Sequence, residues 1–470
     1  MLSPDIALIL LITFGLAWIA MGIFWGRKAK NLDGFMLAGR NVGLALGAAT
    51  AMATWVTSNT VMLAPQFAVQ MGIWGLIAYA TASFGLFLFA PMAFRIRQLI
   101  PNGYTSGDFI RLRYGKVAWI IFLIISATYS LAWLVSMAIA GGVVLNALSG
   151  LDYVIGMSSI LLVCVVYTLF GGLYAVIGTD FVQSIIILIG VVVVGTLVLI
   201  KVDIDDVHAQ LSTEQPMLLQ VFMPVALLSI FNNMFFGFGE IFHNNVWWSR
   251  VFAMRQEIAP KAFFLSGLFW FPIPIAAGFI GLCAGALSIN IPDPNMTGPL
   301  IASQVLGKAG AIVVFIVVFC SLASSIDSLL AATSDLFAED VVRKMIKPDI
   351  SENQLRKLSS VIIISLGVLT WALSFNKANL LEVLFRSGPL VGSAIWPVIA
   401  GLYWQKASSL GAILAMIGGS VAGSIAYELS GWYTATLIST MISMVIVFLA
   451  RCINPIHFDW ATLQEKSKTA

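Results

Sequence analysis

The stretch Gly43–Phe67, GLALGAATAMATWVTSNTVMLAPQF, decides how this chain folds. It is long enough to cross a bilayer, which takes about 20 residues in a helix. Its centre, however, carries small and hydroxyl side chains in place of large apolar ones. A later stretch, Phe231–Arg250, FNNMFFGFGEIFHNNVWWSR, has the same character and contains Gly237, Gly239 and Glu240. Small residues let helices pack closely, but Asn, Glu and His together are costly in lipid. Both stretches therefore predict interrupted helices.

The composition places the whole chain in a membrane. Of its 470 residues 60% are apolar and 10% charged, with a mean hydropathy of +0.96. Soluble domains have about 45–50% apolar and about 25% charged residues. The net charge of +3 is too small to indicate a nucleic-acid partner. Four cysteines and three histidines show no ligand spacing. We expect an all-α integral membrane protein without a metal site of that kind.

Thirteen apolar runs qualify as membrane spans, and together they leave no room for a separate soluble domain. They lie near residues 5–24, 44–69, 72–94, 117–147, 153–171, 180–201, 217–249, 260–288, 308–338, 357–375, 380–404, 407–428 and 432–451.

The basic residues orient these spans, because positively charged loops stay in the cytoplasm. One side has 21 Lys and Arg residues and the other has three, Lys201, Lys308 and Lys377. We therefore expect the N-terminus outside and the C-terminus in the cytoplasm. The residues of the basic side are Arg27, Lys28, Lys30, Arg40, Arg95, Arg97, Arg111, Arg113, Lys116, Arg250, Arg255, Lys261, Arg343, Lys344, Lys347, Arg356, Lys357, Lys406, Arg451, Lys466 and Lys468.

The two interrupted spans are the second and the seventh, five apart along the chain. Discontinuous helices at matching positions of two inverted halves are typical of the binding site of secondary transporters. This spacing predicts a single transmembrane domain over residues 1–470 with two inverted five-helix repeats, spans 2–6 and 7–11. Its parts are an extra helix at 5–24, repeats at 41–201 and 217–404, two helices within 407–451, and a cytoplasmic tail at 452–470.

The ninth span carries a stripe of hydroxyl groups. Ser321, Ser324, Ser325 and Ser328 recur at the spacing of one helix face, with Asp327 beside them. Serines in membrane helices often only bond back to their own helix. A flanking carboxylate inside the membrane favours an ion path instead. Oxygen ligands of this kind suit a hard cation such as sodium.

Several motifs resemble the sodium/solute symporter family over roughly residues 30–450. They are Tyr167–Asp180, YTLFGGLYAVIGTD, the stretch Ser321–Asp327, SLASSID, with Glu339 and Asp340 after it, and Gly39–Asn41 before the second span. The resemblance implies a sodium site formed by the carbonyls of Ala53, Val56 and Ser321 and the hydroxyls of Ser324 and Ser325. It also implies a further cation site at Asp180, Ser324, Asp327 and Ser328. Asp327 stands where the family usually has serine, which leaves three alternatives: a stronger cation site, a proton site, or no site.

Within the family the chain is most similar to the urea and polyamine branch. The similarity lies in Thr54–Trp55, in the stretches 100–105, 111–115 and 247–250, and in FWFPIP at 269–274. Glu240 stands where sugar transporters place an aromatic gate, which argues against a sugar. The side chains that we expect to contact a small polar solute are Trp55, Asn59, Gln66, Asn232, Asn233 and Glu240.

These observations predict a sodium-coupled symporter of the plasma membrane, bacterial inner membrane by its short loops, that imports urea or a polyamine-like amine by alternating access. Proline or another amino acid, a small carboxylate, proton coupling and a channel stay open as alternatives. An enzyme is disfavoured, because His243 near Glu240 is the only acid–base pair in sight. The expected partners are the solute, the sodium ion and the bilayer, without nucleic acid or an organic cofactor. The sequence does not indicate an oligomeric state.

Overall fold

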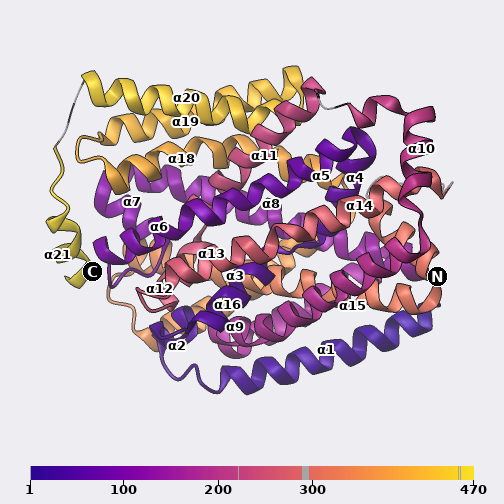
Figure 1. Cartoon of the computed structure of the whole chain (residues 1–470). Coiled ribbons are helices and arrows are strands. Elements are labelled where there is room, and N and C mark those ends of the chain that lie inside the picture. The colour runs from indigo at the N-terminus through magenta and orange to yellow at the C-terminus, as the bar shows by residue number, and fades with distance from the viewer. Residues whose placement is uncertain (1, 221, 288–295, 454, 456, 470) are drawn as a thin grey trace.

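A computed structural model describes residues 2–220, 222–287, 296–453, 455 and 457–469 (Figure 1). These residues form helices and no named strand; the end of the eighth candidate span at 288 and parts of the tail lie outside them. The α-helices are α1 (Pro4–Gly26), α2 (Leu32–Leu37), α3 (Leu44–Trp55), α4 (Ser58–Met71), α5 (Ile73–Ala80), α6 (Phe84–Leu99), α7 (Ser106–Tyr114), α8 (Lys116–Ser149), α9 (Tyr153–Lys201), α10 (Ile204–Glu214), α11 (Pro224–His243), α12 (Asn245–Ala253), α13 (Ala259–Trp270), α14 (Pro272–Ala286), α15 (Thr297–Leu336), α16 (Glu352–Leu373), α17 (Leu380–Phe385), α18 (Gly388–Tyr403), α19 (Ser409–Ser430), α20 (Trp432–Ile453) and α21 (Ala461–Thr469).

The long helices lie side by side between two ends of the molecule. In Figure 1, α1 forms one edge of the bundle and α19 with α20 forms the opposite edge. The short helices α2, α7, α12 and α21 gather at one end, and α10 lies at the other. Within the described residues, 11 helical stretches are long and apolar enough to cross a membrane. The all-helical membrane architecture predicted from the sequence is therefore confirmed.

The helix α9 is too long for one crossing and folds back on itself. Its 49 residues would extend about 73 Å at 1.5 Å per residue, far beyond a hydrocarbon core of about 30 Å. At Gly172 the backbone turns, with φ 51° and ψ −140°. Tyr167 before the turn and Thr179 after it both approach the carboxylate of Asp327. The two halves of α9 therefore lie beside each other against α15.

Both predicted interruptions are present. The first separates α3 from α4 at Val56, where ψ is 80°, and Thr57, where ψ is 165°. The second separates α11 from α12 at Asn244, where ψ is 133°. Gly237 and Gly239, which lie within the same stretch, are both helical. Gly237 instead allows close packing of α11, since a Cβ added there would lie 2.4 Å from the carbonyl oxygen of Ala82.

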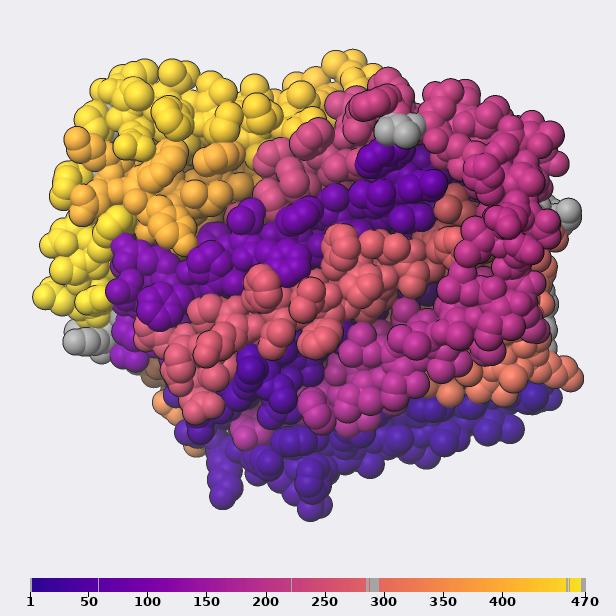
Figure 2. Space-filling view, in the orientation of Figure 1, coloured from indigo at the N-terminus to yellow at the C-terminus, as the bar shows by residue number. Residues whose placement is uncertain are grey.

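Large apolar side chains are exposed on many of the long helices, whose packing side by side Figure 2 shows from one face. On α1, for example, Ile9, Ile12 and Leu16 are each more than 60% exposed. Exposed apolar patches of this extent mark contact with another apolar phase. Most of the basic residues predicted to be cytoplasmic belong to the end that carries α2, α7 and α21 (Figure 1).

Candidate functional site

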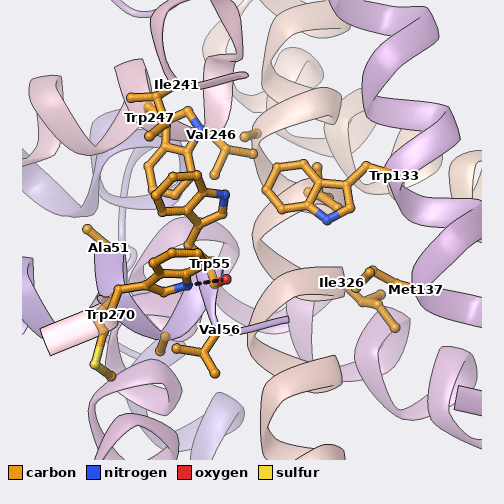
Figure 3. Packing of buried hydrophobic residues seen from close by; sticks show 14 of the residues in the cluster. Ala51, Trp55, Val56, Trp133, Met137, Ile241, Val246, Trp247, Trp270 and Ile326 are labelled. Carbon is orange, nitrogen blue, oxygen red and sulfur yellow. Dashed lines mark hydrogen bonds between the residues drawn. The ribbon is translucent and has the colours of Figure 1, made fainter. Parts of the chain in front are cut away.

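The interruption after α3 leaves backbone carbonyls without helical partners, and neighbouring helices supply donors to them. The last four carbonyls of any helix lack intrahelical N–H partners. Ser324 Oγ donates to the Ala53 carbonyl at 2.8 Å, and Ser325 Oγ donates to the Thr54 carbonyl at 2.9 Å. The Trp270 indole donates to the Trp55 carbonyl at 2.7 Å, the bond drawn in Figure 3. The broken backbone is thus held by side chains of α15 and α13.

The structure brings together most of the residues predicted to bind sodium. Ser324 and Ser325 also bond to the Ser321 carbonyl, at 3.2 and 2.9 Å. Ala53, Ser321 and the two serines therefore form one cluster of carbonyl and hydroxyl oxygens between α3 and α15. Val56 is buried at the break, but the carbonyl that meets Ser325 belongs to Thr54. The carbonyl oxygens now accept hydrogen bonds from the two serine hydroxyls. A desolvated cation could replace these hydrogen bonds and be coordinated by the carbonyl and hydroxyl oxygens together.

The interruption after α11 is supported mainly by asparagine side chains. Asn244 accepts from the Val246 N–H at 2.9 Å and donates to Ser130 of α8 at 3.2 Å. Asn245 donates to the Ala332 carbonyl of α15 at 2.8 Å. The Asn244 oxygen satisfies one of the N–H groups that lack a partner at the start of α12, and the other bonds reach neighbouring helices. The interruption is therefore anchored to α8 and α15.

A cavity of about 30 Å³ lies between the two interruptions. A buried water needs about 10–15 Å³ by the same kind of measure, so the space accommodates about two waters. Its wall is mainly aromatic: Trp55 and Trp270 stack with ring centroids 4.5 Å apart, and Trp133 lies across from them (Figure 3). The lining residues are Trp55, Thr57, Asn59, Thr60, Tyr79, Ala82, Trp133, Asn233, Phe236, Glu240, Trp270, Leu384 and Phe385.

Four of the six predicted solute contacts line this cavity: Trp55, Asn59, Asn233 and Glu240. The other two, Gln66 and Asn232, are not among the lining residues. Asn232 instead accepts from the backbone N–H groups of Thr436 and Leu437 at 2.9 and 3.2 Å, which joins α11 to α20.

Two oxygen atoms of the cavity lining, Asn59 Oδ1 and Glu240 Oε1, lack a hydrogen-bond partner among the described residues. The Asn59 amide donates one N–H to Ser136 Oγ at 3.2 Å, and its oxygen has no partner among the described residues. The Glu240 carboxyl lies near the Tyr129 hydroxyl and the Trp55 indole. Glu240 Oε1 and the Tyr129 hydroxyl are both unpartnered among the described residues.

Neither His243 nor Arg250, the two basic residues that follow Glu240 in this stretch, is bonded to Glu240. His243 Nδ1 meets the carbonyl of Gly239 at 2.5 Å, and its ring packs against Tyr129. Arg250 points elsewhere. The sequence placed Arg250 in a cytoplasmic loop, but its side chain is fully buried and pairs with Asp180 at 3.4 Å. Arg250 is buried because the span does not end at residue 249: after the break at Asn244 it continues as α12, which carries Arg250 among buried residues.

Two of the four predicted ligands of the second cation site, Asp180 and Ser328, contact Arg250. Its Nη2 donates to Ser328 Oγ at 2.6 Å and to Asp180 Oδ2 at 3.4 Å. Asp327 accepts from the Tyr167 hydroxyl at 2.7 Å. Motif reasoning included Tyr167 only as part of a signature and missed Arg250. The available signal was a single arginine between two apolar runs, Val246–Trp248 and Val251–Ala253.

A charged cluster closes the end of the bundle near α7. Lys344 Nζ lies 2.6 Å from Asp108 and 3.6 Å from Asp340. Thr105 and Trp119 donate to the Asp340 carboxylate at 2.5 and 3.0 Å. Burial by itself would raise the pKa of Asp108, but the Lys344 ammonium and the Tyr104 N–H hold it below its ordinary value. The cluster therefore ties α7 to the end of the α15 segment.

The comparison with protein families decides the identity. Residues 35–419 match the model of the "Sodium:solute symporter family". The chain belongs to this family. The resemblance noted in the sequence is confirmed, and the family is one of transporters rather than enzymes.

Relatives of this symporter include urea and proline transporters. The "Urea-proton symporter DUR3" of Oryza sativa subsp. japonica is 27% identical over an alignment of 502 positions, which covers 93% of this chain and 68% of that protein. The "Osmoregulated proline transporter OpuE" of Bacillus subtilis (strain 168) is 25% identical, over 87% of each chain. A solved structure of a Na+-coupled sialic acid symporter, in a substrate-bound outward-open state, has a TM-score of 0.82 at 18% identity, over 95% of this chain and 98% of that one. That structure shares the fold.

The bond between Trp270 and the broken backbone can be tested directly. Replacing Trp270 with Phe keeps the ring but leaves the Trp55 carbonyl with only the longer bond from Thr60, at 3.3 Å. Losing a buried partner costs about 1–3 kcal/mol, so we expect a lower thermal unfolding midpoint in detergent. Trp371→Phe is the control, because that indole donates to Ser158 at an exposed site. Equal effects of both changes would contradict a special role for Trp270.

Proposed function

We propose that this symporter uses the sodium gradient to import a small neutral solute rich in N–H donors, of the urea class, by alternating access. The single observation that carries the proposal is the placement of unpartnered acceptors in an aromatic cavity, next to a cluster of carbonyl and hydroxyl oxygens. Family membership and the urea transporters among the relatives support it.

The coupling ion is sodium in this proposal because the oxygen cluster suits it. Unwound backbone carbonyls beside a broken helix coordinate sodium in transporters, and the Ala53 carbonyl lies 2.8 Å from Ser324 Oγ. Binding an ion there would turn both serine hydroxyls from donors to carbonyls into ligands of the ion. The name of the rice relative includes proton coupling, so proton coupling is the alternative that experiments must separate.

The solute is assigned from the groups that would receive it. Asn59 and Glu240 each present an oxygen without a partner, and a urea-like molecule offers N–H groups to both while its flat face stacks on Trp55. Among the described residues that line the cavity none is basic. A carboxylate solute would therefore meet Glu240 without a compensating charge.

The finer architecture belongs to the same proposal. The 11 long stretches become 13 crossings when α9 is divided at Gly172 and the pair α3–α4 is added. The two inverted repeats would then begin at the two interrupted helices, as the five-span spacing predicts. The basic end near α7 would face the cytoplasm, in a plasma membrane.

The sodium site predicts a specific loss. Changing both Ser324 and Ser325 to Ala removes two oxygen ligands. Because the same hydroxyls donate to the freed carbonyls of Ala53 and Thr54, the double variant is first checked for folding by its thermal unfolding in detergent. We expect the sodium concentration for half-maximal uptake to rise about tenfold or more, since about 1.4 kcal/mol equals one decade. The measurement is radiolabelled urea uptake into proteoliposomes over a range of sodium concentrations.

A control on the same helix is Ser334→Ala, because Ser334 is also buried and bonds only to a carbonyl of its own helix. An unchanged sodium dependence in a folded Ser324/Ser325 double variant would rule the site out.

The cavity carboxylate predicts a change in the solute rather than in the ion. Glu240→Gln keeps the shape of the side chain and removes the charged acceptor, and hydrogen bonds to charged groups contribute about 1.5–3 kcal/mol. We expect urea uptake to fall about tenfold or more while sodium still stabilises the protein. The paired readouts are urea uptake and sodium-dependent thermal stability.

Glu428→Gln provides an exposed control, since that carboxylate pairs with Arg386 at the surface. If Glu240→Gln abolishes sodium binding as well, Glu240 has a structural role. Preferred uptake of a carboxylate solute by the unaltered protein would refute this assignment of the solute.

A further inference from the structure

Arg250 is the most completely bonded charged side chain of the site. Its guanidinium is fully buried and has contacts in four directions. Nε donates to Thr50 Oγ1 at 3.1 Å, and Nη1 donates to the Val246 carbonyl at 2.9 Å. Nη2 donates to Thr54 Oγ1 and to Ser328 Oγ, both at 2.6 Å, and lies 3.4 Å from Asp180 Oδ2.

These contacts involve the oxygen atoms that a second bound cation would need. Asp180 and Ser328 are two of its predicted ligands, and both already face the guanidinium. Thr50 donates to the same Asp180 oxygen at 2.5 Å. A sodium ion at this place would have to displace hydrogen bonds and would sit beside a fixed positive charge, because arginine does not deprotonate in proteins.

The charges of Asp180, Asp327 and Arg250 balance with one free ion. Asp180 and Asp327 are both fully buried, and together they contribute two negative charges when ionised. Arg250 supplies one positive charge. A sodium ion among Ala53, Ser324 and Ser325, one helical turn from Asp327 on α15, supplies the second. A further sodium ion would leave an excess positive charge in the interior of the protein, which is costly.

We propose that Arg250 is a tethered cation that takes the place of a second sodium ion, so that this symporter binds one sodium ion per cycle. The inference rests on the proposed sodium coupling. In this proposal the number of bound sodium ions is set by Arg250, a side chain of the broken seventh span. Arg250 contacts α3, α9 and α15 at the same time.

The number of bound ions can be counted without any solute. At high concentration a ligand stabilises the folded state in proportion to the logarithm of its concentration, with a slope set by the number of sites. The experiment measures the stability of the purified full chain in detergent against sodium chloride, with choline chloride keeping the ionic strength constant. We expect a slope for one ion in the unaltered protein.

Arg250→Ala removes the tethered charge and vacates its space between two carboxylates. We expect this variant to bind two sodium ions, which doubles the slope. Arg113→Ala is the matched control, since Arg113 is buried too but donates to the carbonyls of Trp404 and Ala407. It should leave the count at one.

Arg250→Ala leaves the buried carboxylates of Asp180 and Asp327 without their shared positive neighbour, which could prevent folding. A second variant, called the neutral pair, therefore removes both charges of the ion pair, by Asp180→Asn together with Arg250→Gln. We expect this pair to bind one ion. A count of two in the unaltered protein or in the neutral pair, or a count of one in a folded Arg250→Ala variant, overturns the inference. A count of zero in the unaltered protein contradicts the sodium coupling itself.

Discussion

Backbone carbonyls freed inside the membrane are the constraint on which the site depends. In a bilayer a polar group without a partner costs several kcal/mol, so a helix can stop at Val56 only where neighbours supply donors. Ser324, Ser325 and Trp270 do so for three consecutive carbonyls. The same three bonds hold α3 against α13 and α15. The feature that creates an ion site also defines the packing around it.

A second constraint is the charge that the site buries. Removing one partner of a buried ion pair is far more costly than never having the pair. The ion pair of Arg250 and Asp180 therefore holds α12 against α9. The bonds of Arg250 to Thr50 and Ser328 also hold α12 against α3 and α15. In the alternating-access cycle that we propose, these four helices belong to the region that changes conformation. Because Arg250 and Asp180 are buried and paired, α12 and α9 either move together or each of these residues must find another charged or polar partner.

Sequence reasoning succeeded where a local pattern has a direct physical reading. The small and hydroxyl residues of Gly43–Phe67 predicted the break of α3, and the serine spacing predicted the face of α15 that meets it. It failed where contacts join distant segments. Arg250 was read as a loop residue because the positive-inside rule counts charges by position along the chain. Gln66 and Asn232 were grouped with the solute contacts by residue type, while the actual bonds of Asn232 go to α20, some 200 residues away.

The central claim is that a sodium gradient drives a urea-like solute through the cavity between the two interruptions. The most direct test is uptake of radiolabelled urea into proteoliposomes that contain only this protein, with either an inward sodium gradient or an inward proton gradient of equal size. Accumulation above the outside concentration with the sodium gradient, and none with the proton gradient alone, is the result we predict. Accumulation driven by the proton gradient alone, or equilibration without any accumulation, would contradict the account.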